Sequence, residues 1–345
     1  MRRYFLALLT LLVITGLLLS VACVAPTPPS EVTPPPPAEE KPPEVTPPPP
    51  AEEGPPPEEE LPSFPLTITD DLGREVEIVK QPQRIISLAP SNTEILFALG
   101  LGDSVVGVTQ YCNYPEAAKT KPRVAGYSTP DIEKVVSLTP DLVLAESIHE
   151  ETALPVLESL GLTVVVTSAK SLDTVLHDII LVGQIAGKSK AAAQLVGDLD
   201  KRIKAVTAKT EGLAPEQRTR VLYVIWHDPI WTLGSETFLD DLIQKAGGVN
   251  IFAKDFKKSR VVSPEEVVAR NPQVIIVSSM GTSGDLIYNS IKADPRLSTV
   301  EAIVKGQVYQ VDGDLIERPG PRVVDGLEQV AKLIHPEIFG APETE

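Results

Sequence analysis

The sequence predicts an α/β protein with two lobes, each a mostly parallel sheet flanked by helices, joined by one long interlobe helix. Apolar runs of strand length alternate with helical segments, which is typical of parallel sheets. One helix–strand unit occurs twice, at 131–144 and at 263–276. Each copy has a capping residue, a glutamate two residues later, a Val-Val pair and a proline before an apolar run. The repeat predicts two lobes of one plan with a ligand cleft between them.

The elements of the first lobe follow from local patterns. Alternating residues at 66–70 and 74–79 flank Asp71-Leu72-Gly73, which predicts a hairpin. Ser91 to Glu94 resembles a helix start, so a helix is expected over 95–99 and should end at Gly100. The other expected strands are 84–88, 105–108, 142–145 and 164–167, and the other expected helices are 133–138 and 151–160.

The segment 171–211 has a helical pattern along its whole length, and a break between two helices is expected at Gly187. Its second part, 189–211, would be about 34 Å long, enough to cross from one lobe to the other. The apolar residues on one face of this helix are Ala192, Leu195, Val196, Leu199, Ile203 and Val206. In the second lobe, strands are expected at 221–226, 274–278 and 308–311, and helices at 238–245, 265–270 and 322–334.

The amino terminus has the features of a secretory signal. Arg2 and Arg3 precede an apolar run, 4–19, that is short for a membrane span. The residues 20–23 resemble the lipobox of bacterial lipoproteins, although Ser20 stands where leucine is usual. We therefore expect a signal peptide at 1–22 and lipidation of Cys23. An ordinary cleaved signal and a retained anchor are the alternatives.

The next segment has a composition unlike the rest of the chain. Seventeen of the 34 prolines and nine glutamates lie between Pro26 and Pro62, where there is a single lysine. Such a segment cannot bury enough apolar area to fold, which predicts an extended, disordered tether over 23–63. The expected organisation after the tether is an N-terminal lobe at 64–187, the interlobe helix at 188–212 and a C-terminal lobe at 213–340.

Several functional classes are not supported by the sequence. The net charge is −16 and no basic patch is present, so nucleic acid is not an expected partner. The motifs of serine hydrolases, zinc proteases and P-loop enzymes are absent, and nothing around Cys112 suggests a nucleophile. The four histidines do not cluster, and Cys23 and Cys112 form no metal motif. We expect no enzymatic activity, no cofactor and no metal site.

Several motifs in order resemble the substrate-binding proteins of ABC importers for cobalamin and iron chelates. The segment 84–100 is similar to the opening of these proteins, and 137–143 is similar to their "L-x-P-D-L-V" signature. The segments 223–234 and 247–252 resemble the cobalamin-type branch, and 318–327 resembles the closing segment. The likeness covers about 66–340. It implies two α/β lobes joined by a long helix, in agreement with the prediction from periodicity.

The resemblance also implies a docking role for Glu133 and Glu265. Glutamates at these positions of the family lie on the lobe tips and pair with arginines of the permease dimer. The alternative is that each glutamate only stabilises the start of its own helix. Asp131 and Glu266 are the substitutes if the alignment is shifted by one residue.

Large flat ligands need aromatic walls, and both tryptophans lie within 226–231. Tyr111, Tyr127 and Trp231 match family positions that face the ligand. Trp226 is a further candidate for the ligand site but ends a strand and is expected to be partly core, and Tyr114 is expected to be structural. His227 could approach a ligand metal or simply form a loop hydrogen bond.

The two arginines near the carboxyl terminus have different expected roles. Arg318 could reach the cleft, and Arg322 is expected to cap the last helix. The single candidate arginine favours a nearly neutral corrinoid, most of all cobalamin.

These features together predict an extracytoplasmic, membrane-anchored lipoprotein that binds cobalamin and delivers it to an ABC permease. A ferric siderophore or haem is the alternative ligand. A sensory or adhesion lipoprotein on the same fold is the alternative class.

Overall fold

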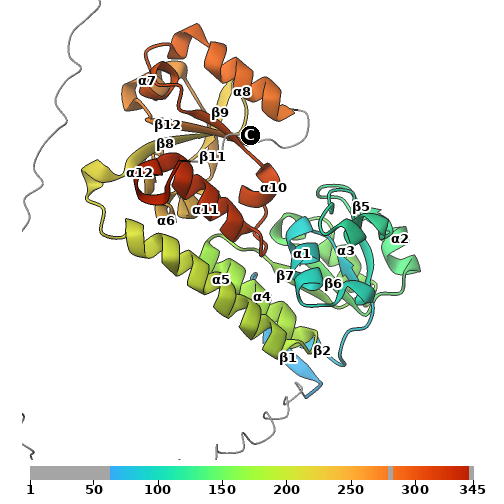
Figure 1. Cartoon of the computed structure of the whole chain (residues 1–345). Helices are drawn as coiled ribbons and strands as arrows, with labels where there is room; N and C mark the ends of the chain where they lie inside the picture. The colour runs from blue at the N-terminus through green and yellow to red at the C-terminus, as the bar shows by residue number, and fades with distance from the viewer. Residues whose placement is uncertain (1–62, 279–282, 342–345) are drawn as a thin grey trace, which may run out of the picture. The chain divides into compact units, whose positions relative to one another are not determined.

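The computed structural model of the chain describes residues 63–278 and 283–341. The expected signal peptide, the lipidation site Cys23 and the tether up to residue 62 lie outside the described residues. The described chain contains a five-stranded and a four-stranded parallel sheet together with two antiparallel pairs (Figure 1). We call the part around the five-stranded sheet the N-terminal lobe and the part around the four-stranded sheet the C-terminal lobe.

The N-terminal lobe begins with the predicted hairpin and continues into the predicted parallel sheet. Strands β1 (Leu66–Thr69) and β2 (Glu75–Ile78) pair antiparallel. The parallel sheet has the order β5-β4-β3-β6-β7. Its strands are β3 (Ile85–Ser87), β4 (Val105–Thr109), β5 (Arg123–Ala125), β6 (Leu142–Glu146) and β7 (Val164–Thr167), and the three helices of this part are α1 (Pro90–Ala98), α2 (Ile132–Ser137) and α3 (Leu154–Ser159).

Alternating side chains explain why this sheet has helices on both faces. Ile85 and Leu144 belong to an apolar cluster with side chains of α1 and α4 (Leu172–Ile185), whereas Ile86 and Val143 belong to a cluster with α2 and α3. Successive strand residues point to opposite faces, so a run that is buried throughout needs cover on both. The predicted α/β class is confirmed.

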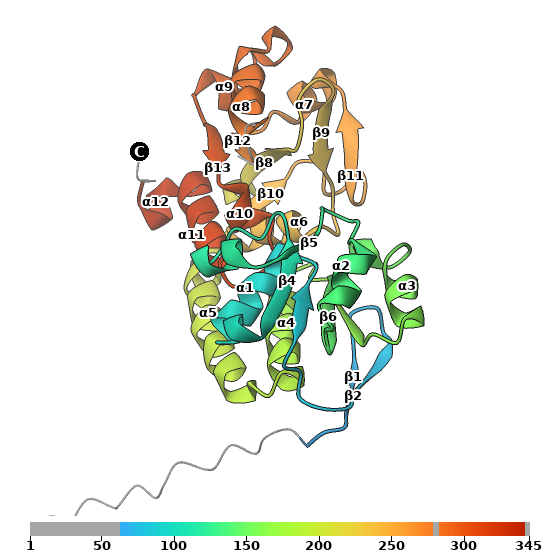
Figure 2. The ribbon, with the colours of Figure 1, turned by 90° about the vertical axis from the view of Figure 1, so that its right-hand side faces the viewer.

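Two helices connect the lobes. Helix α4 (Leu172–Ile185) ends before Gly187, whose φ of +67° suits glycine, and α5 (Ser189–Thr210) follows. The break predicted at Gly187 is confirmed. Helix α5 has 22 residues, or about 33 Å. It contacts α4 as well as helices α6 (Phe238–Lys245) and α11 (Val323–Ile334) of the C-terminal lobe (Figures 1 and 2).

The C-terminal lobe repeats the plan of the first. Its parallel sheet has the order β10-β8-β12-β13. The strands of this sheet are β8 (Thr219–Val224), β10 (Gly248–Asn250), β12 (Val274–Ser278) and β13 (Val308–Val311), and β9 (Ile230–Leu233) pairs antiparallel with β11 (Ser259–Val262). The helices are α6 (Phe238–Lys245), α7 (Pro264–Arg270), α8 (Ser283–Ala293), α9 (Glu301–Val304), α10 (Gly313–Ile316), α11 (Val323–Ile334) and α12 (Pro336–Phe339).

One apolar cluster continues from lobe to lobe. Val221 and Tyr223 of β8 belong to the same cluster as Ile85 of the other sheet, through side chains of α4, α5 and α11. The opposite face of the C-terminal sheet packs in a separate cluster with α7 and α8. The connecting helices are therefore part of the core that supports both sheets.

The start of α1 differs from the prediction. The helix begins at Pro90 after Ala89, and no side chain caps it. Ser91 and Glu94 lie inside the helix and are buried, so they do not form the expected capping pair. Proline supplies a favourable first-turn backbone and has no amide hydrogen to satisfy, which explains a helix start without a side-chain cap.

None of the helices in 63–278 and 283–341 is both long and apolar enough to cross a bilayer.

Candidate functional site

The aromatic residues singled out by the sequence follow the carboxyl ends of parallel strands or lie beside them. Tyr111 follows β4, Tyr127 follows β5 and Trp226 follows β8, while Trp231 lies on β9. Their exposed fractions are 46%, 68%, 42% and 43%, respectively. Ligands of open α/β sheets bind at the carboxyl ends of the strands. Both lobes therefore present large, solvent-exposed rings where this fold class binds ligands.

Tyr111 and Tyr127 form an edge-to-face pair in the N-terminal lobe. Their ring centroids are 6.1 Å apart and their planes are inclined at 85°. Although Tyr127 is 68% exposed, partial desolvation of its hydroxyl group raises the pKa of Tyr127, and the carboxylates of Glu146 and Glu317 raise it further. Glu146 ends β6, whereas Glu317 follows α10 in the C-terminal lobe. The Tyr127 hydroxyl thus lies within electrostatic reach of acidic groups from both lobes, which the sequence alone did not identify.

Trp226 and Trp231 face each other across the turn between β8 and β9. The Trp231 amide donates to the Trp226 carbonyl at 2.9 Å, and the two residues form an antiparallel bridge. Val261 pairs with Trp231 on the neighbouring strand and is 47% exposed. Directly paired residues lie on one face. Trp226 was expected to be partly core, but it is half-exposed and belongs to this apolar surface.

His227 has a partner within its own lobe. Its Nε2 lies 2.9 Å from Oδ2 of Asp294, which is buried. Arg296 also binds Asp294, and mainly its hydrogen bonds hold the pKa of Asp294 well below the usual range. This arrangement supports the loop hydrogen bond that was the alternative to metal contact. We do not include His227 in the proposed ligand site.

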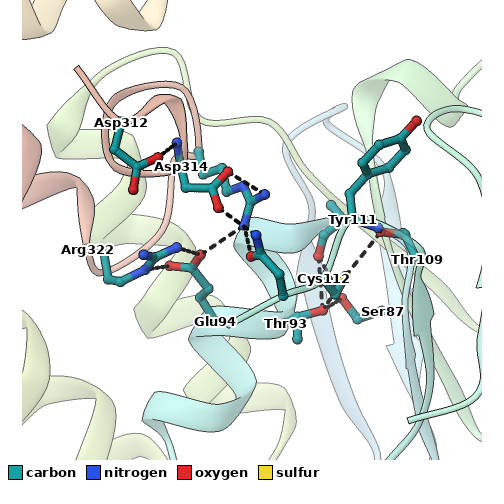
Figure 3. A network of polar contacts seen from close by, with 12 residues as sticks. Ser87, Thr93, Glu94, Thr109, Tyr111, Cys112, Asp312, Asp314 and Arg322 are labelled. Carbon is teal, nitrogen blue, oxygen red and sulfur yellow. Dashed lines mark hydrogen bonds and ion pairs between the residues drawn. The ribbon is translucent and has the colours of Figure 1, made fainter. Parts of the chain in front are cut away.

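Arg318 and Arg322 bind acidic groups of the protein, and Figure 3 shows Arg322 beside Glu94. Arg322 donates to both carboxylate oxygens of Glu94, at 3.0 and 2.6 Å. Arg318 lies 2.5 Å from Asp314 and 3.7 Å from Glu94, and its side chain is only 12% exposed. Arg322 was expected to cap the last helix, but no side-chain cap is formed there. Its guanidinium group instead spans to the other lobe.

Glu94 was missed as a partner of these arginines. The only signal in the sequence is a carboxylate next to the apolar run of α1, because a buried charge requires a partner. Tyr114, expected to be structural, lies beneath the Arg322 guanidinium, 4.1 Å from ring centroid to Cζ. The buried thiol of Cys112 contacts the hydroxyls of Thr93 and Thr109, each at 3.1 Å (Figure 3).

The two repeated glutamates occupy equivalent, exposed positions. Glu133 lies in the first turn of α2 and Glu265 in the first turn of α7. The caps are other residues, since the Asp131 side chain accepts from the Lys134 amide and Ser263 accepts from the Glu266 amide. Neither Glu133 nor Glu265 forms an ion pair or a side-chain hydrogen bond with another described residue. Their carboxylates are therefore available to a partner.

Asp131 and Glu266, the alternatives to Glu133 and Glu265 for docking, already form contacts within their own helices. Asp131 accepts the cap hydrogen bond and pairs with Lys134 at 3.0 Å. Glu266 accepts the Ser263 amide at 2.8 Å, which closes a capping box. These contacts separate the helix-capping residues from the exposed glutamates beside them.

Two surface hollows lie away from the exposed aromatic residues. The larger, about 510 Å³, is beside β10, and the smaller, about 210 Å³, is beside β2. In the larger one, Lys245 pairs with Asp173 and Asp241 accepts the Leu172 amide. In the described residues, no group of three or more His, Cys, Asp and Glu side chains is arranged to hold a metal ion.

Comparison with known proteins places these features in a family. Residues 85–315 match the periplasmic binding protein family. A Bacillus subtilis protein, named an uncharacterized ABC transporter substrate-binding lipoprotein, is 35% identical over 284 residues, covering 80% of this chain and 87% of its own length. The vitamin B12-binding protein of Vibrio cholerae is 32% identical over 253 residues, covering 73% of this chain and 89% of its own length.

Solved structures agree with the sequence matches. A crystal structure of the Vibrio cholerae vitamin B12-binding protein has a TM-score of 0.64 and covers 73% of this chain and 96% of its own. A haem-binding protein from Roseiflexus, in its apo form, is 27% identical with a TM-score of 0.66, covering 73% of this chain and 98% of its own. The chain therefore belongs to the periplasmic binding protein family, in the group of ABC substrate-binding proteins that includes vitamin B12 and haem binders.

Proposed function

We propose that this protein binds a corrinoid, cobalamin, between its two lobes and delivers it to an ABC permease. The observation that carries the proposal is the set of large exposed aromatic side chains at the strand ends of both lobes. Tyr111 and Tyr127 would contact the ligand from one lobe, and Trp226 and Trp231 from the other. Flat walls of this kind suit a corrin ring. The sequence similarity to vitamin B12-binding proteins supports the same ligand.

The charges beside these rings favour a ligand without acidic groups. Haem propionates and the phenolates of many siderophores need cationic partners. Arg318 and Arg322 are already paired with Asp314 and Glu94. Glu146 and Glu317 add negative charge near Tyr127. A nearly neutral corrinoid avoids an electrostatic penalty that an anionic chelate would incur.

Haem is the second candidate ligand. The similarity to a haem-binding protein of known structure favours it, and exposed aromatic rings would also stack on a porphyrin. A ferric siderophore remains the third. In each case the protein would bind and release its cargo without chemical change, as the names of the related binding proteins imply.

The permease would dock on Glu133 and Glu265. Both carboxylates are exposed and free of contacts with described residues, and they occupy the same place in the two copies of the repeated helix–strand unit. Charge pairs at the rim of an interface govern recognition and association rate more than the affinity for a ligand bound elsewhere.

The chain would be held at the membrane through lipid on Cys23. Small residues precede this cysteine and a Pro/Glu-rich segment follows it. The related Bacillus subtilis protein carries the name of a lipoprotein. A sensory or adhesion lipoprotein would share this anchor but would not need the two docking glutamates.

Titration calorimetry of the full chain with cyanocobalamin, haem and ferric siderophores tests the ligand. We expect saturable binding of cyanocobalamin and much weaker binding of the acidic chelates. Preferred binding of haem would replace the corrinoid assignment, and failure of all three ligands to bind would contradict the transport proposal.

A further inference from the structure

A polar network with the buried carboxylate of Glu94 at its centre connects the two lobes beside Tyr111, and the proposed ligand contacts do not use it. We propose that Glu94, Asn113, Asp314, Arg318 and Arg322 form an interlobe lock, which fixes the spacing of the lobes and positions the loop that carries Tyr111. These are positioning residues, since none of them needs to touch the ligand. The proposal concerns the geometry of the protein and does not depend on which ligand it binds.

The centre of the interlobe lock is the pair Glu94–Arg322. Glu94 lies in α1 of the N-terminal lobe and Arg322 precedes α11 of the C-terminal lobe, so the two are 228 residues apart in the chain. The guanidinium group donates to both carboxylate oxygens, at 3.0 and 2.6 Å, and the Glu94 side chain is only 2% exposed. A buried two-point contact of this kind fixes orientation as well as distance.

The second part of the interlobe lock passes through Asn113. Its Oδ1 accepts from Arg318 Nη1 at 2.6 Å, and its Nδ2 donates to Asp314 Oδ2 at 2.7 Å. Arg318 and Asp314 both belong to the C-terminal lobe and pair with each other at 2.5 Å. Because Asn113 is two residues from Tyr111, these bonds tie the loop of a proposed ligand contact to the opposite lobe.

The charges within the interlobe lock balance. The carboxylates of Glu94 and Asp314 oppose the guanidinium groups of Arg318 and Arg322. Removing one partner of a buried ion pair leaves an uncompensated charge, whereas replacing both with neutral groups costs much less. A double replacement by glutamine therefore weakens the lobe contact while avoiding the penalty of a stranded charge.

Distance measurement between the lobes tests the interlobe lock without any ligand. Val156 on α3 and Val304 on α9 are exposed and lie in different lobes. Spin labels would be attached to Val156→Cys and Val304→Cys in the full chain carrying Cys23→Ser, where the buried Cys112 stays unreactive. We expect Glu94→Gln with Arg322→Gln to broaden the distance distribution and shift its mean, and we expect amide exchange of residues 111–114 to become faster.

The matched control is Arg220→Gln with Glu301→Gln. This pair has the same residue types at 2.9 Å but lies within the C-terminal lobe. We expect it to leave both readouts unchanged. If the Glu94→Gln, Arg322→Gln variant does not fold, Asn113→Ala is tested in its place, because Asn113 is exposed. We then expect faster amide exchange of residues 111–114. An unchanged distance distribution together with unchanged loop exchange in the folded variant would overturn the interlobe lock.

Discussion

Trp226 and Trp231 pair directly across the turn between β8 and β9, with a hydrogen bond of 2.9 Å from the Trp231 amide to the Trp226 carbonyl. The pair holds two large rings on one face of the hairpin, and each ring is almost half exposed. Tryptophan surface that stays in contact with water contributes no hydrophobic stabilisation to the fold. Their exposure is explained if a ligand covers them.

Trp231→Ala and Tyr127→Ala should each weaken the binding of cyanocobalamin. Loss of a stacked ring costs about 1–3 kcal/mol of binding free energy. Calorimetric titration of each variant measures this loss. Leu160→Ala is the control, because Leu160 is 52% exposed at the end of α3, away from the strand ends that carry the aromatic residues. Wild-type affinity in both aromatic variants would show that neither Trp231 nor Tyr127 contacts the ligand.

Glu133→Ala with Glu265→Ala should leave ligand affinity unchanged and reduce transport and permease association. The two carboxylates are exposed and cap nothing, so their loss should not affect folding. Glu151→Ala with Glu216→Ala removes one exposed glutamate from each lobe and serves as the control. Uptake assays in cells that express the cognate permease compare the variants. Normal transport by the Glu133 and Glu265 variant would disprove docking through these residues.

Asp178 should make the stability of the protein fall as the pH rises. Its side chain lies in α4 and is 2% exposed, and burial, followed by the nearby charge of Asp71, raises the pKa of Asp178 to about 9. In the unfolded chain this group ionises near its ordinary value of 3.8. Between these two values the folded protein holds a proton that the unfolded chain has lost. Stability contributed by this group is therefore present at low pH and is lost as the pH rises from about 4 to about 9.

Asp178→Asn tests this dependence because asparagine stays neutral. We expect the variant to be more stable than the parent at pH 8, with a free energy of unfolding that declines less steeply with pH, by at most about 1.4 kcal/mol per unit. Urea unfolding at several pH values gives both quantities. Asp198→Asn, on the exposed surface of α5, is the control and should leave the slope unchanged. If the free energy of unfolding has the same slope with pH in the parent and in Asp178→Asn, the raised pKa of Asp178 is contradicted.

Cys23→Ala should release the protein from membranes. A lipid chain on this cysteine would be the anchor, and alanine cannot carry it. Detergent partition of cell fractions measures the change. If the variant partitions with the membrane as the parent does, the segment before residue 23 is a retained anchor and Cys23 is not lipidated.

Most of the helices and strands that the sequence predicts follow from patterns of neighbouring residues. Hydrophobic periodicity, capping residues and Gly187 give α4, α5 and the break between them, because each depends on residues within a few positions. The three-residue strands β5 and β10 and the pair β9 and β11 were not predicted. A strand of three residues is too short to show an alternating pattern. Each of these four strands also depends on a partner strand that supplies its hydrogen bonds, and the sequence does not identify that partner.

The sequence by itself determined the two α/β lobes, the family and the candidate rings Tyr111, Tyr127 and Trp231, because these follow from periodicity and from motifs in order. Tertiary structure alone decided which charges are free. Arg318 and Arg322 were candidates for a ligand or a helix end. The fold brings Glu94 of the other lobe to both of them, while Arg318 also pairs with Asp314 four residues earlier. Asp131 and Ser263 cap their helices as the repeat predicts, and the structure leaves the carboxylates of Glu133 and Glu265 without a partner among the described residues. A charged side chain is available to a partner only if no neighbour in space neutralises it, and those neighbours can be more than 200 residues away in the chain, as Glu94 and Arg322 are.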